Sequence, residues 1–150
     1  MAVIAILLVA LVIGVTAKMV WQNIKVPAYV GMQDGKFAPL PSSPNAVSSQ
    51  TNETARKVEP LPTRATLEET RNAITHTLSQ LGKNKIITLE GSYVHTVFTS
   101  AQMGYNDDVE FWIDQDEGVV HYRSQSRVGY GDMGANRARY ENFKRIYSAN

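Results

Sequence analysis

The sequence predicts an α+β domain that follows a single N-terminal transmembrane helix. An uncharged apolar segment opens the chain at residues 2–17, and two amphipathic helical patterns flank a run of alternating strands. The strands are joined by few residues, and such short connections require antiparallel pairing, since a parallel pair needs a long crossover. We therefore expect an antiparallel sheet of about four strands, with two helices on one of its faces.

Composition limits the function classes. The 150 residues suit one domain, and 15 Lys plus Arg stand against 14 Asp plus Glu, for a net charge of +1. This balance argues against nucleic acid as a partner. The chain has no Cys, which excludes disulfides, thiolate metal sites and a Cys nucleophile.

The apolar segment is long enough to cross a bilayer. Residues 2–21 span about 30 Å as a helix, which matches the hydrocarbon core. Lys18 and Trp21 then suit the membrane interface, and Pro27 ends the helix. Residues 15–17 also offer the small side chains of a signal-peptide cleavage site, but no Lys or Arg precedes the apolar stretch. We expect residues 1–26 to be an uncleaved anchor.

The remaining chain divides into a linker and a domain. All 6 prolines lie between residues 27 and 62, where no apolar period is visible, so we expect a linker over residues 27–40. Thr66 and Glu69 form a capping-box pattern at the start of a helix that stops before Gly82. The strands are expected at 86–89, 93–99, 109–113 and 119–124, and a last helix at 135–147.

Standard catalytic motifs are missing from the sequence. There is no Gly-x-Ser-x-Gly, no His-Glu-x-x-His and no phosphate loop, so we expect no enzyme activity, no metal and no cofactor. A hydrolase would have to be assembled from scattered residues, and some of the same groups could hold a metal. The residues available for these alternatives are His95, His121, Asp107, Asp108, Ser124 and Ser126.

A glycine loop precedes the last helix. Residues 129–134 read Gly-Tyr-Gly-Asp-Met-Gly, but only 16 residues follow, too few for the second half of a dinucleotide-binding fold. Backbone N–H groups at a helix start, with arginines nearby, suit an anion. Asp132 could instead cap the helix and occupy those donors.

Opposite charges occupy neighbouring elements. Residues 106–117 hold six acids and no Lys or Arg, whereas residues 123–145 hold six bases and two acids. We expect either a structural ion-pair network or an open pocket for phosphate, carboxylate or a lipid headgroup. The candidate residues are Arg123, Ser124, Arg127, Gly129, Gly131, Asp132, Asn136 and Arg137, with Asp107, Asp108 and Glu110 as acidic partners.

Four strings, in order, resemble one known family. They are Pro-Asn-Ala-Val-Ser-Ser-Gln at 44–50, Asp-Asp-Val-Glu-Phe at 107–111, Arg-Ser-x-Ser-Arg-x-Gly at 123–129, and Asp-x-Gly-x-Asn-Arg-x-Arg at 132–139. Together they are similar to domain-of-unknown-function family 1499, found in bacteria and plant plastids. The resemblance covers about residues 40–147.

The resemblance carries no activity, substrate or catalytic residue. It implies that residues 44–50 belong to the domain, which we therefore place at 41–150. It also implies an exported domain, because members commonly carry an N-terminal signal, anchor or transit segment. We expect a single-pass protein of a bacterial inner membrane with a periplasmic domain, although Lys18 and Lys25 after the span favour the cytoplasmic side.

These observations lead to two hypotheses about function. The first is a non-catalytic membrane-anchored accessory or interaction subunit of an energy-converting or envelope complex, with another membrane protein as its partner. The second is a small domain, either a binding domain or an enzyme, that takes an anion or lipid headgroup in the polar cluster around the glycine loop. An interaction subunit should expose an apolar patch, whereas a binding domain should show polar groups that converge in a hollow.

Overall fold

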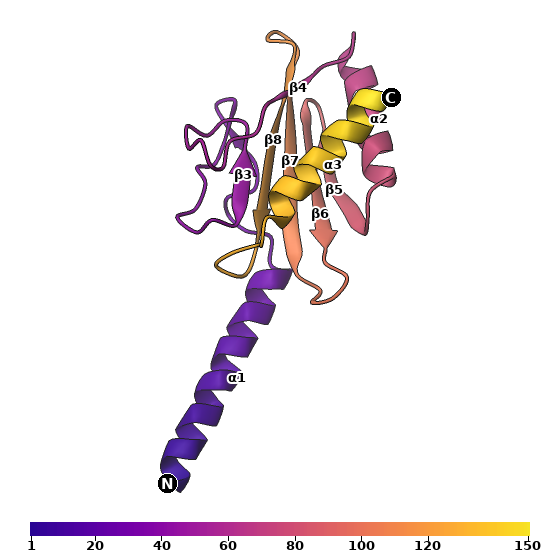
Figure 1. Cartoon of the computed structure of the whole chain (residues 1–150). Helices are drawn as coiled ribbons and strands as arrows, with labels where there is room; N and C mark the ends of the chain where they lie inside the picture. The colour runs from indigo at the N-terminus through magenta and orange to yellow at the C-terminus, as the bar shows by residue number, and fades with distance from the viewer.

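Helix α1 (Ala2–Ile24) projects away from the rest of the chain, as Figure 1 shows. The computed structural model describes residues 1–150. None of the α1 side chains is buried, and this helix is long and apolar enough to cross a membrane. A signal sequence near the N-terminus has the same properties.

The domain is built on a six-stranded antiparallel sheet. Four strands follow the order β8-β7-β6-β5, as the alternating pattern predicts, and two short strands from the proline-rich region join β8 at its free edge. The prediction of about four strands was therefore too small. The bounds are β3 (Ala46–Ser48), β4 (Leu61–Pro62), β5 (Asn84–Glu90), β6 (Tyr93–Thr99), β7 (Asn106–Asp114) and β8 (Val119–Ser126).

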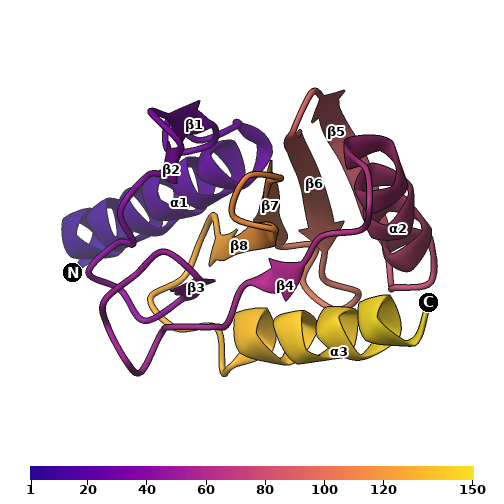
Figure 2. The same cartoon turned by 90° about the horizontal axis from the view of Figure 1, so that it is seen from above.

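Two helices pack on one face of this sheet, as Figure 2 shows from above. Helix α2 (Leu67–Ser79) begins at the predicted capping box, in which the Thr66 hydroxyl accepts from the Glu69 N–H and the Glu69 carboxylate accepts from the Thr66 N–H. Helix α3 is Ala135–Ala149. A core of 15 buried residues lies between helices and sheet, and includes Ile74, Leu78, Phe111, Tyr122, Phe143 and Tyr147.

The segment after α1 lies against the opposite face. Residues 27–40, expected as a linker, contain the hairpin of β1 (Met32–Gln33) and β2 (Lys36–Phe37). The Gln50 side chain accepts from the Phe37 N–H and donates to the Gly35 carbonyl, which joins this hairpin to the domain. Gly35 has a positive φ of 72°, and a Cβ there would lie 3.2 Å from the Trp112 ring, so glycine suits the close approach.

Candidate functional site

A buried group of charged side chains lies on the sheet face away from α2 and α3. Successive strand residues point to opposite faces, so alternate residues of β6, β7 and β8 share this face while their neighbours fill the core. The segment after α1 covers them. This charged cluster comprises Tyr29, Tyr93, His95, Asp108, Glu110, Arg123, Gln125 and Arg127.

One half of the charged cluster surrounds Asp108, which is fully buried. Its carboxylate accepts two hydrogen bonds from Arg127, at 2.9 Å from Nε and 2.8 Å from Nη2. It also accepts from His95 Nε2 at 2.8 Å and from the Tyr29 hydroxyl at 3.0 Å. Burial alone would raise the pKa of Asp108, but the hydrogen bonds from His95 and Arg127 outweigh it and hold this pKa below its ordinary value.

The other half surrounds Glu110, also fully buried. Its carboxylate accepts from Arg123 Nη1 at 2.8 Å, from the Tyr93 hydroxyl at 2.7 Å and from the Gly31 N–H at 2.7 Å. The Tyr29 ring stacks on the Arg123 guanidinium, 4.5 Å away. Burial, followed by the nearby carboxylates, raises the pKa of both tyrosines above its ordinary value, so both keep the proton they donate.

The charges of the cluster balance within it. Two carboxylates face two guanidiniums, and both carboxylates are held by several donors. Arg123 also donates to Gln125, and only its Nε is buried without a hydrogen-bond partner. Arg123 and Arg127 are therefore already paired with carboxylates, and neither side chain offers an open site to an added anion.

A second polar group lies on the helix side of β8, centred on Asn136. This fully buried amide donates to the Asn45 carbonyl at 2.9 Å and to the Ser126 hydroxyl at 3.0 Å, and it accepts from Ser124. Asp132 accepts from the N–H groups of Gly134 and Asn136, both at 3.0 Å, and so caps the start of α3. The N–H groups of Gly134, Ala135 and Asn136, which could have held an anion at this helix start, are therefore occupied by Asp132.

The structure does not gather the predicted site residues in one place. Arg123 and Ser124 are neighbours on β8 and therefore point to opposite faces of the sheet. Arg137 bonds only to the carbonyls of Ala55 and Lys57, at 3.0 and 2.9 Å, and meets no carboxylate. In the glycine loop, the Gly129 carbonyl accepts from Asn45 at 2.8 Å, and Gly131 lines a surface hollow.

The acidic partners divide between the two faces. Asp108 and Glu110 join the charged cluster, whereas Asp107 faces the helices and pairs with Arg139. His95 and Asp108 form the hydrogen-bonded pair that a Ser-His-Asp triad needs. However, Ser124 and Ser126 lie on the other face of the sheet with Asn136, so neither of these serines completes a triad with His95 and Asp108.

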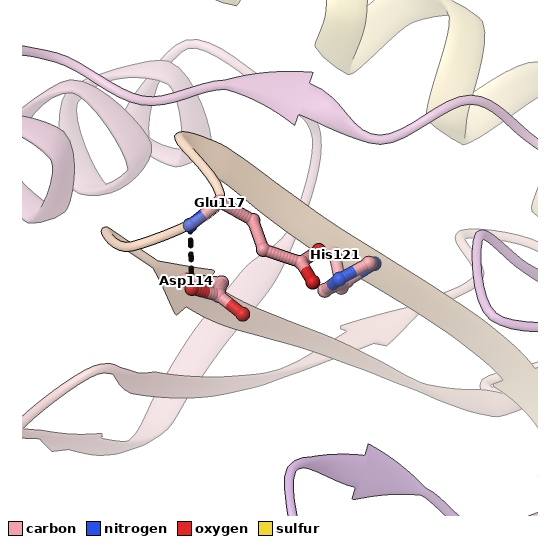
Figure 3. A group of neighbouring side chains, drawn as sticks. All are labelled: Asp114, Glu117 and His121. Carbon is pink, nitrogen blue, oxygen red and sulfur yellow. Dashed lines mark hydrogen bonds between the residues drawn. The ribbon is translucent and has the colours of Figure 1, made fainter.

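Of the residues named from the sequence as metal ligands, His121 lies with two carboxylates that were not named, Asp114 and Glu117. The three side chains lie close together at the β7–β8 hairpin (Figure 3), and their ligand atoms are within 4.8 Å of one another. Asp114 already accepts the Glu117 N–H at 3.0 Å, which shapes the turn. His121 stacks on Trp112 with 5.1 Å between ring centroids, and burial lowers its pKa. The hydrogen bond within the turn and the stacking of His121 on Trp112 therefore explain why these three side chains lie together, without a bound cation.

The charged cluster continues into the end of α1. Arg127 Nη1 donates to the carbonyls of Asn23 and Ile24, both at 3.1 Å, and so satisfies acceptors at the helix C-terminus. The Asn23 side chain donates to the Gly104 carbonyl at 2.8 Å and accepts from the Asn106 N–H at 2.7 Å. Asn106 Nδ2 returns a bond to the Asn23 carbonyl at 2.9 Å. Helix and domain are thus joined by five hydrogen bonds.

Sequence reasoning missed several members of these groups. Tyr93 is two residues from His95 on β6, and Gln125 is two residues from Arg123 on β8. Each pair therefore points to the same face of the sheet, and the alternation of strand residues could have predicted this. Tyr29, Gly31 and Asn23 carried no such signal. Their partners lie 79 to 104 residues away in the chain, and nothing local predicts which strand a covering segment will cross.

The lowered pKa of Asp108 predicts an acid-sensitive stability. A carboxylate whose pKa is lower in the folded than in the unfolded protein stabilises the fold at every pH above the unfolded pKa, here about 3.8. This stabilisation is lost as the pH falls through the folded pKa. We expect the difference in unfolding free energy between the wild type and Asp108→Asn to be constant near neutral pH and to shrink in acid. Denaturant unfolding at a series of pH values measures it.

An exposed carboxylate provides the control for this prediction. Asp116 lies on the β7–β8 hairpin and accepts no hydrogen bond, so the difference between the wild type and Asp116→Asn should stay small at every pH. If the difference in unfolding free energy between the wild type and Asp108→Asn were likewise the same at every pH, the buried carboxylate would contribute no pH-dependent stability.

Comparison with known proteins gives one match. No curated protein matches the chain, and no solved structure does. A family model described as a protein of unknown function (DUF1499) matches residues 36–146, which include all six strands of the sheet, helix α2 and most of helix α3. This match confirms the resemblance found in the four sequence strings, and the chain belongs to the DUF1499 family.

Proposed function

We propose that this protein is a non-catalytic accessory subunit, which α1 anchors in a membrane and which presents its α+β domain to another membrane protein or complex. The junction between α1 and the domain is the observation that supports this. A flexible tether would leave the domain free to turn, whereas here Asn23, still within the helix, is bonded to Gly104 and Asn106. The direction of the helix therefore sets the orientation of the domain.

A fixed orientation suits an interaction subunit. An anchored domain stays close to the bilayer, which raises its effective concentration for partners in the same membrane. Because the domain does not turn relative to α1, its orientation relative to the membrane plane is fixed. The same surface of the domain is therefore always available to a partner in that membrane. Less orientational freedom then has to be lost when a partner docks.

The charged cluster supports a structural role over ligand binding. Arg123 and Arg127, the arginines expected to hold an anion, each bond a carboxylate that is completely buried. Opening them to a ligand would leave these two charges without their partners, at a cost of several kcal/mol each. The cluster instead holds the segment after α1 on the sheet and ties it to the helix end.

Native gels of the full chain test the proposal under two conditions. In one, the protein is extracted in mild detergent, and in the other it is cross-linked in the membrane before extraction. We expect the wild type to migrate with a larger assembly of constant composition. Asn23→Ala removes two side-chain bonds between helix and domain without touching Asp108 or Glu110, so it should weaken that assembly while the domain stays folded. A wild-type protein that remains monomeric in both conditions would contradict the proposal.

We further propose that the domain lies on the periplasmic side of a bacterial inner membrane. Asn150 ends α3 far from α1 (Figure 1) and is exposed, so a reporter fused there should leave the fold intact. A reporter that is active only outside the cytoplasm should be active, and protease added to spheroplasts should remove the domain. Protection from protease, with an inactive reporter, would show that Lys18 and Lys25 set the cytoplasmic orientation.

A further inference from the structure

We infer that two loops of the domain, residues 100–105 and 127–134, lie in the lipid–water interface and contact the bilayer directly. This inference rests on the anchoring role proposed for α1. The first loop joins β6 to β7, and the second joins β8 to α3. Both lie at the end of the domain that meets α1, as Figure 1 shows.

Hydrogen bonds fix the height of both loops relative to the helix. The Gly104 carbonyl accepts from Asn23, and Arg127 at the start of the second loop binds the Ile24 carbonyl. Trp21, which is suited to the headgroup region, precedes Asn23 by two residues, or about 3 Å along the helix axis. The loops therefore sit within a few Å of the level at which α1 leaves the hydrocarbon core.

Exposed apolar side chains are concentrated on these loops. Five large hydrophobic residues after Val26 are exposed, and three of them are Met103, Tyr130 and Met133, with 64%, 79% and 105% of their surface accessible. We call these three residues the loop tips. Soluble surfaces rarely cluster such side chains without a partner, and tyrosine is enriched at membrane interfaces.

The charges of the two loops are compatible with lipid contact. Their only charged residues are Arg127, paired with Asp108, and Asp132, which accepts backbone N–H groups at the start of α3. No free carboxylate would therefore be pressed against lipid phosphates. On the neighbouring side of the helix end, Lys83 and Lys85 line a surface hollow together with Ile24, which favours anionic lipid.

A hollow between the two loops completes the surface. It has a volume of about 460 Å³, and its walls include Met103 and Tyr105 from one loop and Val128 and Met133 from the other. Two carboxylates also line it, and both are already bonded, Asp107 to Arg139 and Asp132 to backbone N–H groups at the start of α3. The position of this surface beside α1, the exposed loop tips and the lack of a free charge all favour the bilayer as its binding partner.

The absence of native cysteine allows a direct test on the full chain. Single cysteines at Met103→Cys and Met133→Cys carry an environment-sensitive fluorophore, and the protein is placed in vesicles that contain phospholipid with a nitroxide quencher near the headgroup. Asp116→Cys, on the hairpin at the far end of the sheet, is the matched exposed control. We expect several-fold stronger quenching at positions 103 and 133 than at position 116.

A fourth label separates this inference from the anchoring role. Val9→Cys, in the middle of α1, should be quenched by lipid that carries its nitroxide deep in the acyl chain. Quenching at position 9, with positions 103 and 133 no more quenched than 116, would overturn the lipid contact and leave the anchor intact. No quenching at position 9 would instead overturn the anchor, and strong quenching at 103 and 133 would then still support contact between loops and lipid.

Discussion

Arg123→Met is expected to lower the free energy of unfolding by about 3–5 kcal/mol, the usual cost of removing one partner from a buried ion pair. Arg123 and Glu110 are both inaccessible to solvent, and their side chains are 2.8 Å apart. Methionine fills most of the volume but leaves the Glu110 charge with only neutral donors, from Tyr93 and Gly31. Domains of this size have a stability of roughly 5–15 kcal/mol, so the loss is a large part of the total.

Denaturant unfolding of the full chain in detergent measures this loss, and two further variants interpret it. The double variant Glu110→Gln with Arg123→Met removes both charges and should recover part of the stability, because the uncompensated buried carboxylate is gone. Arg145→Met replaces an exposed arginine and should change the stability by no more than about 0.5 kcal/mol. If Arg123→Met were as stable as Arg145→Met, the charged cluster would not hold the fold together.

Arg127→Gln is expected to cost about 3 kcal/mol and to be insensitive to phosphate. The change removes both guanidinium bonds to the buried Asp108 and the two bonds to the end of α1. His95 and Tyr29 still donate to Asp108, which keeps the loss below that for a completely unpaired charge. Thermal melts of the wild type and the variant, with and without phosphate, measure both effects.

The same melts distinguish a structural arginine from an anion-binding one. Arg137→Gln is the matched control, because Arg137 bonds only backbone carbonyls, and we expect it to cost about 1 kcal/mol. A stable Arg127→Gln protein that had lost a phosphate-dependent rise in melting temperature would contradict the structural role. The anion-binding hypothesis would then be the better account of this cluster.

The parts of the fold with a clear period could be predicted from the sequence. Val109, Phe111 and Ile113 alternate toward the core, and the capping box at Thr66 marks the start of α2. Strands β3 and β4 could not be found this way, since they have only three and two residues and follow no alternation. Their pairing depends on the edge that β8 offers, which exists only in the folded sheet.

The candidate site was predictable only where charge and strand order determine it. Acids on one strand and bases on the next become cross-strand neighbours, and Glu110 lies directly opposite Arg123. Arg137 was grouped with them because it is close in sequence, yet its helix position directs it to Ala55 and Lys57 instead. The contacts made by Asn23 depend on where α1 meets the sheet, which no local pattern encodes.

The distance between α1 and the domain tests the central claim most directly, namely that helix and domain form one rigid unit. Spin labels at Val9→Cys and Asp116→Cys, in the full chain in lipid nanodiscs, report this distance and its spread. We predict a single narrow distribution, which should broaden when Asn23→Ala and Arg127→Gln together remove four of the five hydrogen bonds at the junction. A distribution in the wild type as broad as in that variant would show that the domain moves freely on its anchor, and would contradict the account.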